Sequence, residues 1–297
     1  MKIIITGSES FVGRELIRQC LLGGFEVYGV DLLEAPSQNY AYHKADIREE
    51  NIAEYVPENA DALIHLAALS TDAMCRGKLY ECFDVNVLGT LNLMRAATAK
   101  NVKQFIFASS EWVYEKFLGD EEKNEEAIID IAGHTSEYAL SKLVSEANLR
   151  IQYKNGFCSA TILRFGIIYG PRKAPPAGGW GAVESIMSQV KHQEEVTVGS
   201  VRSGRRFIHI EDIARGIVQA IGLGGFEIIN LCGDRLITLG EIIKESEKIF
   251  GKKVKIIEKT PGEVSVRNPL NEKAKRLLNW KQKIDVATGL KTLLPFV

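Results

Sequence analysis

The chain has 297 residues, of which 45% are hydrophobic and 25% charged, and its formal net charge is −1. These values are ordinary for a globular protein that forms one large domain or two closely packed ones. They exclude a general basic footprint for nucleic acid, and no apolar run of 18 residues suggests a membrane span.

The first 31 residues predict a strand, a tight loop, a helix and a second strand. Residues 2–6 hold three consecutive isoleucines, which fit a strand buried on both faces of a parallel sheet. Gly7 and Gly13 bracket the loop, where free N–H groups and the positive end of the helix suit a phosphate. Asp31 follows about 20 residues later, where a dinucleotide fold holds the ribose hydroxyls.

The middle position of the Gly-x-x-Gly-x-x-Gly spacing is occupied by Ser10 instead of glycine. A serine there either crowds a pyrophosphate or donates a hydrogen bond to it. The loop alone is also compatible with an ordinary tight turn. Strand, loop, helix, strand and acid together favour a dinucleotide.

Two further strands are predicted at residues 40–45 and 61–67. Strands that alternate with helical patterns indicate a parallel sheet with right-handed crossovers. Ligands of such sheets lie outside the carboxyl ends of the strands. Asp31, Asp46 and Ala68 all stand at such ends, so the sequence predicts a single cleft there.

The elements that follow are a helix at 85–97, a strand at 102–108, an acidic run at 119–126, a helix at 136–153 and a strand at 160–164. The acidic run is interpreted as a solvated loop. Later come a strand at 226–231, a helix at 239–250 capped by Thr238 and ended by Gly251, lysines at 252, 253 and 255 on a strand edge, and a helical terminus at 273–294 around Trp280.

A loop rich in proline and glycine at 171–181 marks the passage into a smaller domain. We expect an α/β fold with a Rossmann-like, doubly wound parallel sheet formed by residues 1–166 and about 206–222. The smaller, interleaved substrate domain is expected at about 167–205 and 223–297.

Five cysteines are dispersed along the chain, mostly in apolar surroundings: Cys20, Cys75, Cys82, Cys158 and Cys232. An odd, dispersed set predicts reduced thiols in a cytoplasmic protein and not a disulfide frame. The histidines show no ligand spacing among themselves or with the cysteines, so no metal site is expected. The start of the chain is too soon interrupted for a signal peptide.

Tyr138 and Lys142 are four residues apart in a predicted helix and therefore share a face. A nearby ammonium favours phenolate, so we expect Lys142 to lower the tyrosine pKa from about 10. Ser110 follows the strand at 102–108 on the cleft side, where its hydroxyl would hold a substrate oxygen. Tyr138 and Lys142 alone favour an exposed helix pair, but the dinucleotide cleft and Ser110 reverse this preference and favour acid–base chemistry.

The ordered set of features resembles extended short-chain dehydrogenases/reductases, of the NAD-dependent epimerase/dehydratase kind that acts on nucleotide sugars. The resemblance runs the length of the chain: Thr6-Gly7 to Gly13, Asp31, Asp46-Ile47, His65-Leu-Ala-Ala68, Asn86-Val-Leu-Gly-Thr, Ser109-Ser110 with Val113-Tyr114, Tyr138 with Lys142, Arg164 with Tyr169-Gly-Pro171, Arg205 with Phe207 and Glu211-Asp212, and residues 273–280.

The resemblance implies roles for individual residues. It implies NAD as cofactor, held by Gly7, Ser10, Phe11, Val12, Gly13, Asp31, Asp46, Ile47, Leu66, Ala67, Ala68, Asn86, Tyr138 and Lys142. The implied catalytic residues are Ser110, Tyr138, Lys142 and Glu111, and the implied substrate-binding residues are Ser70, Ser110, Glu111, Trp112, Arg205 and Arg267. A carboxylate at position 31 repels a 2′-phosphate and so favours NAD over NADP.

Two departures from the family pattern bear on the reaction. Ile167 stands where an asparagine that contacts substrate phosphate is expected. Glu111 and Trp112 stand where family dehydratases carry an acid pair, or a polar residue and Glu, so dehydration ranks below epimerisation or simple redox. Glu111 itself is either an elimination acid/base or a surface or structural acid.

The sequence therefore predicts an NAD-dependent nucleotide-sugar epimerase, which oxidises its substrate to a keto sugar and reduces it again. A dehydratase or a dehydrogenase/reductase of the same family is the alternative. A non-catalytic NAD-binding sensor is a third hypothesis, although it has no need for Ser110, Tyr138 and Lys142 together. The resemblance also implies a homodimer that pairs the helices beginning near Val85 and Ser136.

Overall fold

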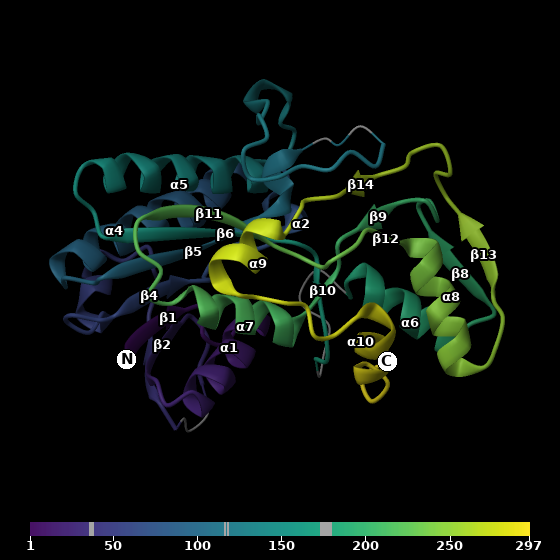
Figure 1. The fold of residues 1–297 in the computed structure, drawn as a ribbon, viewed down its shortest axis with the longest axis horizontal. Coiled ribbons are helices and arrows are strands. Elements are labelled where there is room, and N and C mark those ends of the chain that lie inside the picture. Colours follow the sequence, from purple (N-terminus) through teal and green to yellow (C-terminus); the bar gives the residue numbers. More distant parts are fainter. Residues whose placement is uncertain (36–38, 116, 118, 173–179) are drawn as a thin grey trace.

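A computed structural model describes residues 1–35, 39–115, 117, 119–172 and 180–297 (Figure 1). Its larger part is a seven-stranded sheet in the order β11-β6-β5-β4-β1-β2-β3, and every neighbouring pair is parallel. The Rossmann-like sheet predicted from the sequence is confirmed. Its strands are β1 (Lys2–Thr6), β2 (Glu26–Asp31), β3 (Ala41–Lys44), β4 (Ala62–His65), β5 (Gln104–Ser110), β6 (Ser159–Phe165) and β11 (Phe226–Leu231).

Helices cover both faces of the sheet. Figure 1 shows α4 and α5 along one face, and α1 and α7 along the other. The alternation of β1 explains this arrangement: Ile3 and Ile5 belong to one apolar cluster and Ile4 to the other, and all three are fully buried. The main helices are α1 (Phe11–Leu22), α4 (Gly89–Ala99), α5 (Glu137–Lys154), α7 (Ile210–Ala220) and α9 (Glu272–Leu278).

The smaller part has its own apolar cluster, which includes Met187, Ile243 and Leu290. Its elements are β8 (Glu195–Val198) paired with β13 (Lys255–Glu258), β9 (Gly204–Arg205) between β12 (Ile237–Thr238) and β14 (Val266–Arg267), and the helices α6 (Ala182–His192), α8 (Leu239–Phe250) and α10 (Val286–Thr292). Shorter elements are β7 (Ile168–Tyr169) paired with β10 (Ile208–His209), α2 (Asp72–Cys75), α3 (Leu79–Phe83), and the single turns at Glu50–Tyr55, Asp84–Leu88, Glu111–Tyr114 and Ile131–Gly133.

The domain boundary expected at residue 223 is wrong for β11. This strand pairs with β6 in the seven-stranded sheet, with Ile229 opposite Leu163. Trp280 also packs in the cluster of β1 and α1. The chain therefore returns to the larger part twice after residue 223, because the apolar strand and the indole are buried only there.

The helical terminus expected at 273–294 is two helices, α9 and α10. Asn279 ends α9 with a left-handed backbone, at φ of +50°. Trp280 lies between the helices, fully buried, and its indole N–H donates to the carbonyl of Asp212 at 3.0 Å. That hydrogen bond satisfies the one polar group of the indole. The break between α9 and α10 therefore holds the side chain of Trp280 in its buried position.

The sequence suggested that the acidic run at 119–126 is a solvated loop, but part of it contacts the rest of the protein. Arg206 donates to the carboxylate of Glu122 at 2.8 Å, and the main-chain N–H of Asn230 donates to Glu125 at 2.7 Å. The run therefore contacts β11 and the segment that follows β9.

Lys252, Lys253 and Lys255 pair with Glu194, Glu247 and Glu195, respectively.

Candidate active site

The glycine loop lies directly against the end of β4. A Cβ at Gly7 would meet the N of Ala67 at 2.7 Å, and Gly7 has φ of +72°. A Cβ at Gly13 would meet the carbonyl O of Gly7 at 2.2 Å. Only glycine fits at these two positions, and the loop therefore places its backbone in the cleft beside Ala67 and Ala68.

The start of α1 offers donors to an anion. The N–H groups of Phe11 and Val12 have no acceptor among the described residues, as expected for the first turn of a helix. Beside them, Asp31 ends β2 and accepts the N–H of Glu9 at 2.9 Å. Free donors, a loop that excludes side chains and a carboxylate at the next strand end fit the pyrophosphate and ribose of NAD.

Glu9 is an acidic residue of this corner that the sequence analysis did not single out. It is buried, and its carboxylate accepts hydrogen bonds from the hydroxyl of Tyr40 at 2.8 Å and Nε of Arg14 at 3.1 Å. Its main chain bonds to Asp31, so two carboxylates stand at the same corner. Both oppose a 2′-phosphate, which strengthens the preference for NAD over NADP.

Ser10 is the N-cap of α1. Its Oγ accepts the N–H of Gly13 at 3.0 Å, and its backbone is extended, with φ of −67° and ψ of 168°. Any residue adopts that conformation, so the family's glycine is not required here. The hydroxyl keeps its own hydrogen for a ligand.

We expect Ser10→Gly to keep the affinity for NAD within about tenfold, or about 1.4 kcal/mol. Glycine is an acceptable N-cap and costs only a few tenths of a kcal/mol, whereas Ser10→Ala removes the cap and costs about 1 kcal/mol of stability. Calorimetric titration with NAD and thermal unfolding of both variants measure these effects. A larger loss of NAD affinity in Ser10→Gly would mean that the hydroxyl is itself a phosphate ligand.

Asp46 and Asn86, both expected to bind cofactor, are engaged by the protein. Arg48 donates to the carboxylate of Asp46 through Nε at 2.9 Å, and this bond is the largest influence that lowers the Asp46 pKa. Asn86 accepts the N–H of Leu69 at 2.8 Å and donates to its carbonyl at 3.1 Å. Asn86 therefore positions the loop after β4 through Leu69, which the sequence pattern did not reveal.

Other expected cofactor residues lie at the end of β4 or beside it. Leu66, Ala67 and Ala68 are partly exposed along the cleft, Ser70 is exposed, and Ile47 is buried against Gly89. Ser70 was expected to bind substrate.

Ser110, Tyr138 and Lys142 come together as the spacing predicted. Ser110 is the last residue of β5, and its hydroxyl is close enough to Tyr138, in the first turn of α5, to lower the pKa of that phenol. Nζ of Lys142 lies 5.9 Å from the centre of the Tyr138 ring and donates to the carbonyl of Ala108 at 2.8 Å. All three side chains are buried, so the alternative of an exposed helix pair is wrong.

The expected lowering of the Tyr138 pKa is not what the structure shows. Burial raises the pKa of Tyr138 to about 12, and the hydroxyl of Ser110 only partly opposes this. Burial lowers the pKa of Lys142 to about 8. Both groups lose solvation that stabilises their charged forms, so desolvation outweighs the attraction that the sequence analysis invoked.

Glu111 follows Ser110 directly and is fully buried, so it is not a surface acid. Its carboxylate lies 3.5 Å from Nε of Arg205, a residue of the smaller part. Burial raises the pKa of Glu111 to about 7, against the opposing influence of Arg205 and Arg267. Burial likewise lowers the pKa of Arg205 to about 10.

Arg205 and Arg267 lie opposite each other in the register of β9 and β14. The guanidinium of Arg205 also donates to the carbonyl of Ser265 at 2.7 Å. That of Arg267 lies over Trp112, 3.9 Å from the ring centre. The structure thus gathers two of the expected substrate-binding cations around the residues that follow Ser110.

A buried ion pair behind β5 escaped the sequence analysis. Glu146 accepts from NH2 of Arg164 at 2.7 Å and from the hydroxyl of Ser109 at 2.5 Å. Glu146 follows Lys142 by four residues and Tyr138 by eight. This helical spacing was the available signal, because it places the glutamate on the face that meets the sheet.

Ile167, the departure from the family's asparagine, packs against the apolar cluster of the smaller part. Residues 173–179, from the loop expected to line the substrate pocket, lie outside the described residues.

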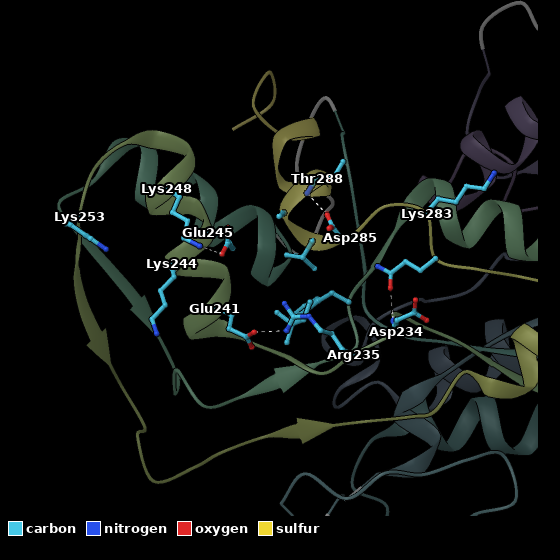
Figure 2. A pocket seen from close by; sticks show the side chains of 15 residues that line it. Asp234, Arg235, Glu241, Lys244, Glu245, Lys248, Lys253, Lys283, Asp285 and Thr288 are labelled. Carbon is cyan, nitrogen blue, oxygen red and sulfur yellow. Dashed lines mark hydrogen bonds and ion pairs between the residues drawn. The ribbon is translucent and has the colours of Figure 1, made fainter.

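A pocket of about 680 Å³ lies in the smaller part, between α8 and α10 (Figure 2). Its charged residues include pairs such as Arg235 with Glu241 and Lys248 with Glu245. Ser110, Tyr138 and Lys142 do not line it, so it is not the candidate active site. Within the described parts of the chain, no helix is long and apolar enough to cross a membrane, and no three His, Cys, Asp or Glu residues gather as metal ligands.

Comparisons with known proteins point to one family. The NAD-dependent epimerase/dehydratase family matches residues 3–232. UDP-glucose 4-epimerase 2 of Oryza sativa subsp. japonica is 28% identical, over 96% of this chain and 78% of the relative.

Solved structures give the same picture. The UDP-glucose 4-epimerase of Thermotoga maritima with UDP-glucose is 25% identical, with a TM-score of 0.87, and the match covers 100% of this chain and 98% of that one. A mutant UDP-glucuronic acid 4-epimerase of Bacillus cereus, in complex with a fluorinated UDP-glucuronic acid and NAD, is 25% identical, with a TM-score of 0.85 and the same coverage.

Proposed function

The chain belongs to the NAD-dependent epimerase/dehydratase family and is an NAD-dependent nucleotide-sugar epimerase, and from this premise we propose that it inverts C4 of a UDP-hexose. The observation that carries the proposal is that Ser110, Tyr138 and Lys142 are buried together at the cleft edge of β5, where Ser110 lowers the pKa of Tyr138 and Lys142 lies beside its ring. The same cleft begins with a glycine loop that fits a dinucleotide.

Bound NAD supplies the acceptor and the donor of hydride. It would be held by the glycine loop, Asp31 and Lys142. Ser110 orients the C4 hydroxyl, and the phenol oxygen of Tyr138 exchanges the hydroxyl proton. With NAD bound, the hydride taken from C4 would return to the other face of that carbon after the keto sugar turns over, so atoms and electrons would balance without an added oxidant.

Arg205 and Arg267 are proposed to bind the substrate diphosphate. Guanidinium groups suit this task because they present several fixed donors to phosphate oxygens. Both side chains already lie beside Glu111 and Trp112. Ile167 offers no polar contact to the phosphates, which leaves the arginines as their main partners.

Epimerisation is favoured over dehydration because the second acid is missing. Trp112 takes that position and packs in a cluster with Tyr138 and Cys75. Glu111 faces Arg205 at 3.5 Å instead of a paired acid. Elimination needs an acid and a base at adjacent carbons, whereas inversion needs no proton transfer besides the exchange at Tyr138, together with the hydride transfer that bound NAD would supply.

A panel of UDP-sugars, incubated with the purified protein with and without added NAD, tests the proposed function. We expect products that differ from the substrates only in configuration at C4. Stoichiometric accumulation of NADH would indicate net redox, and loss of water would indicate dehydration. Either result would overturn the proposal.

We also propose that the protein is a homodimer. Leu79, Tyr80, Leu88 and Leu91 are exposed on the segment from α3 to α4, and an apolar surface of this kind is typical of an interface. We expect a mass near twice 32.9 kDa by light scattering, and a monomer for the double variant Leu88→Glu, Leu91→Glu. A monomeric wild type at micromolar concentration would contradict this.

The protein is further proposed to work in the cytoplasm. All five cysteines are free, and Cys75 and Cys82 remain thiols although they pack in the same cluster. Reduced thiols are typical of that compartment. Fractionation of the source cells would contradict the proposal if the protein appeared in a secreted fraction.

A further inference from the structure

Glu111 carries an unusual buried charge. Its side chain is 0% exposed, and neither carboxylate oxygen has a hydrogen-bond partner among the described residues. The ion pair with Arg205, at 3.5 Å, is its closest charged contact. A carboxylate in this state is costly to bury, and it strongly repels a second anion that enters the same site.

The charges that face Glu111 come from several elements. Arg205 of β9 and Arg267 of β14 are cationic. Tyr138 of α5 and Cys232 after β11 also interact electrostatically with this carboxylate. Both remain neutral because burial raises their pKa values. Neighbours already engaged elsewhere are Lys142 at the carbonyl of Ala108, Asp72 with Arg76, and Glu115 with His134. Glu111 is therefore a single carboxylate that faces two guanidinium groups.

The balance of charges around Glu111 changes when a UDP-sugar binds, a step that rests on the proposed function. Its diphosphate carries two negative charges, which the two arginines neutralise. Glu111 then has no cation left for itself. A neutral sugar adds no charge to that state, whereas a sugar with a carboxylate adds a second anion without a partner.

The distance between the carboxylate of Glu111 and a carboxylate at C6 of the sugar depends on where the sugar ring lies. Ser110 and Tyr138 hold the C4 hydroxyl, and the C6 group is attached to C5, the next carbon of the ring. Glu111 follows Ser110 in the chain and is buried beside it. Under the proposed function, the substituent at C6 would therefore lie on the side of the sugar ring that faces Glu111.

We propose that Glu111 selects the sugar: it rejects UDP-sugars that carry a carboxylate at C6 and admits those with an uncharged group there. The enzyme is then a UDP-glucose-type epimerase and not a UDP-glucuronate-type one.

The pKa of Glu111, raised to about 7 by burial, gives the selection a pH dependence. In the free protein the group is a carboxylate above pH 7, so a uronate enters only if Glu111 takes up a proton. Below pH 7 it takes up a proton, and the repulsion is lost. The preference for the neutral sugar therefore rises with pH through 7.

The experiment measures kcat/KM for UDP-glucose and UDP-glucuronate at pH 6 and pH 8 in wild type, Glu111→Gln and Glu115→Gln. We expect the wild type to prefer UDP-glucose by roughly tenfold or more at pH 8, and less at pH 6. Glu111→Gln should reduce the preference at pH 8 to about threefold or less and remove its pH dependence. Glu115→Gln is the matched control, because Glu115 also acts on Arg267, and it should keep the wild-type preference.

Equal use of both sugars by the wild type at pH 8, or an unchanged preference in Glu111→Gln, would overturn the selection. If Glu111→Gln does not fold, the wild type still decides, since a preference that is flat between pH 6 and pH 8 contradicts the role of Glu111. If no sugar is turned over, the proposed function fails separately. Calorimetric binding of the two UDP-sugars to the wild type then tests the selection by itself, and equal affinities would overturn it.

Discussion

Replacing Tyr138 by phenylalanine should lower kcat for epimerisation by a factor of about 10² to 10⁴. The ring keeps its packing against Cys75 and Trp112, and only the hydroxyl beside Ser110 is lost. No proton can then be exchanged with the C4 hydroxyl at this position. Progress curves with UDP-glucose measure kcat, and calorimetric titration with NAD shows whether the cofactor cleft is intact.

Tyr114→Phe is the matched control for this variant. Tyr114 is also buried, and its hydroxyl donates to Oδ1 of Asn230 at 2.7 Å and accepts from Arg164 at 3.0 Å, so its partners are not those of Tyr138. Its loss should cost about 1 kcal/mol of stability or somewhat more and leave kcat within a few-fold. A Tyr138→Phe enzyme with near wild-type turnover would assign the proton exchange to another group.

The second large effect is expected at the ion pair of Glu146 and Arg164. Both side chains are almost fully buried, at 6% and 4% exposure. Removing one partner leaves the other charge uncompensated in a site closed to water, so Glu146→Ala should lower the free energy of unfolding by about 3–5 kcal/mol. Denaturant titration at neutral pH measures the difference.

Two controls distinguish this from a generic loss of charge. Glu245→Ala removes a partner of the exposed Lys248, which is 70% accessible, and should change stability by less than about 1 kcal/mol. The double variant Glu146→Met, Arg164→Met should recover much of the loss, because replacing a whole buried pair with apolar groups is often neutral. If Glu146→Ala and Glu245→Ala lowered the free energy of unfolding equally, this would contradict the energetic cost assigned to leaving Arg164 buried without its partner.

Local sequence patterns were sufficient to predict the first elements of the fold. The three isoleucines of β1 alternate between the two apolar clusters, and the glycines on either side of Ser10 have no room for a side chain. The alternation along β1 and the close approach of Gly13 to Gly7 depend on neighbours in sequence, which is why β1, the loop and α1 were predicted closely, whereas the room at Gly7 is limited by Ala67 at the end of β4. The spacing of Tyr138 and Lys142 gave their shared face for the same reason.

Burial could not be predicted to the same degree. From the sequence alone, the ammonium of Lys142 is expected to lower the pKa of Tyr138 below its ordinary value. The structure encloses both groups, and desolvation reverses the sign for the tyrosine. How far a side chain is removed from water depends on segments far away in the chain, here those around Cys75 and Trp112.

Long-range pairing explains the other corrections. β11 pairs with β6 although residues 166–225 lie between the two strands in the chain, because parallel strands need a long crossover connection. Nothing local to residues 226–231 names that partner. The same holds for Glu111, whose cation comes from β9 of the smaller part, so its burial and its charge environment emerged only with the fold.

The most direct test of the account follows deuterium at C4. UDP-glucose labelled with deuterium at C4 is incubated with the protein as purified, without added NAD, and the product is examined by NMR. We predict UDP-galactose that retains the label at C4, because the hydride leaves and returns within one site. Loss of the label to solvent, accumulation of NADH, or a product that has lost water would contradict an epimerase that acts through a transient 4-keto sugar.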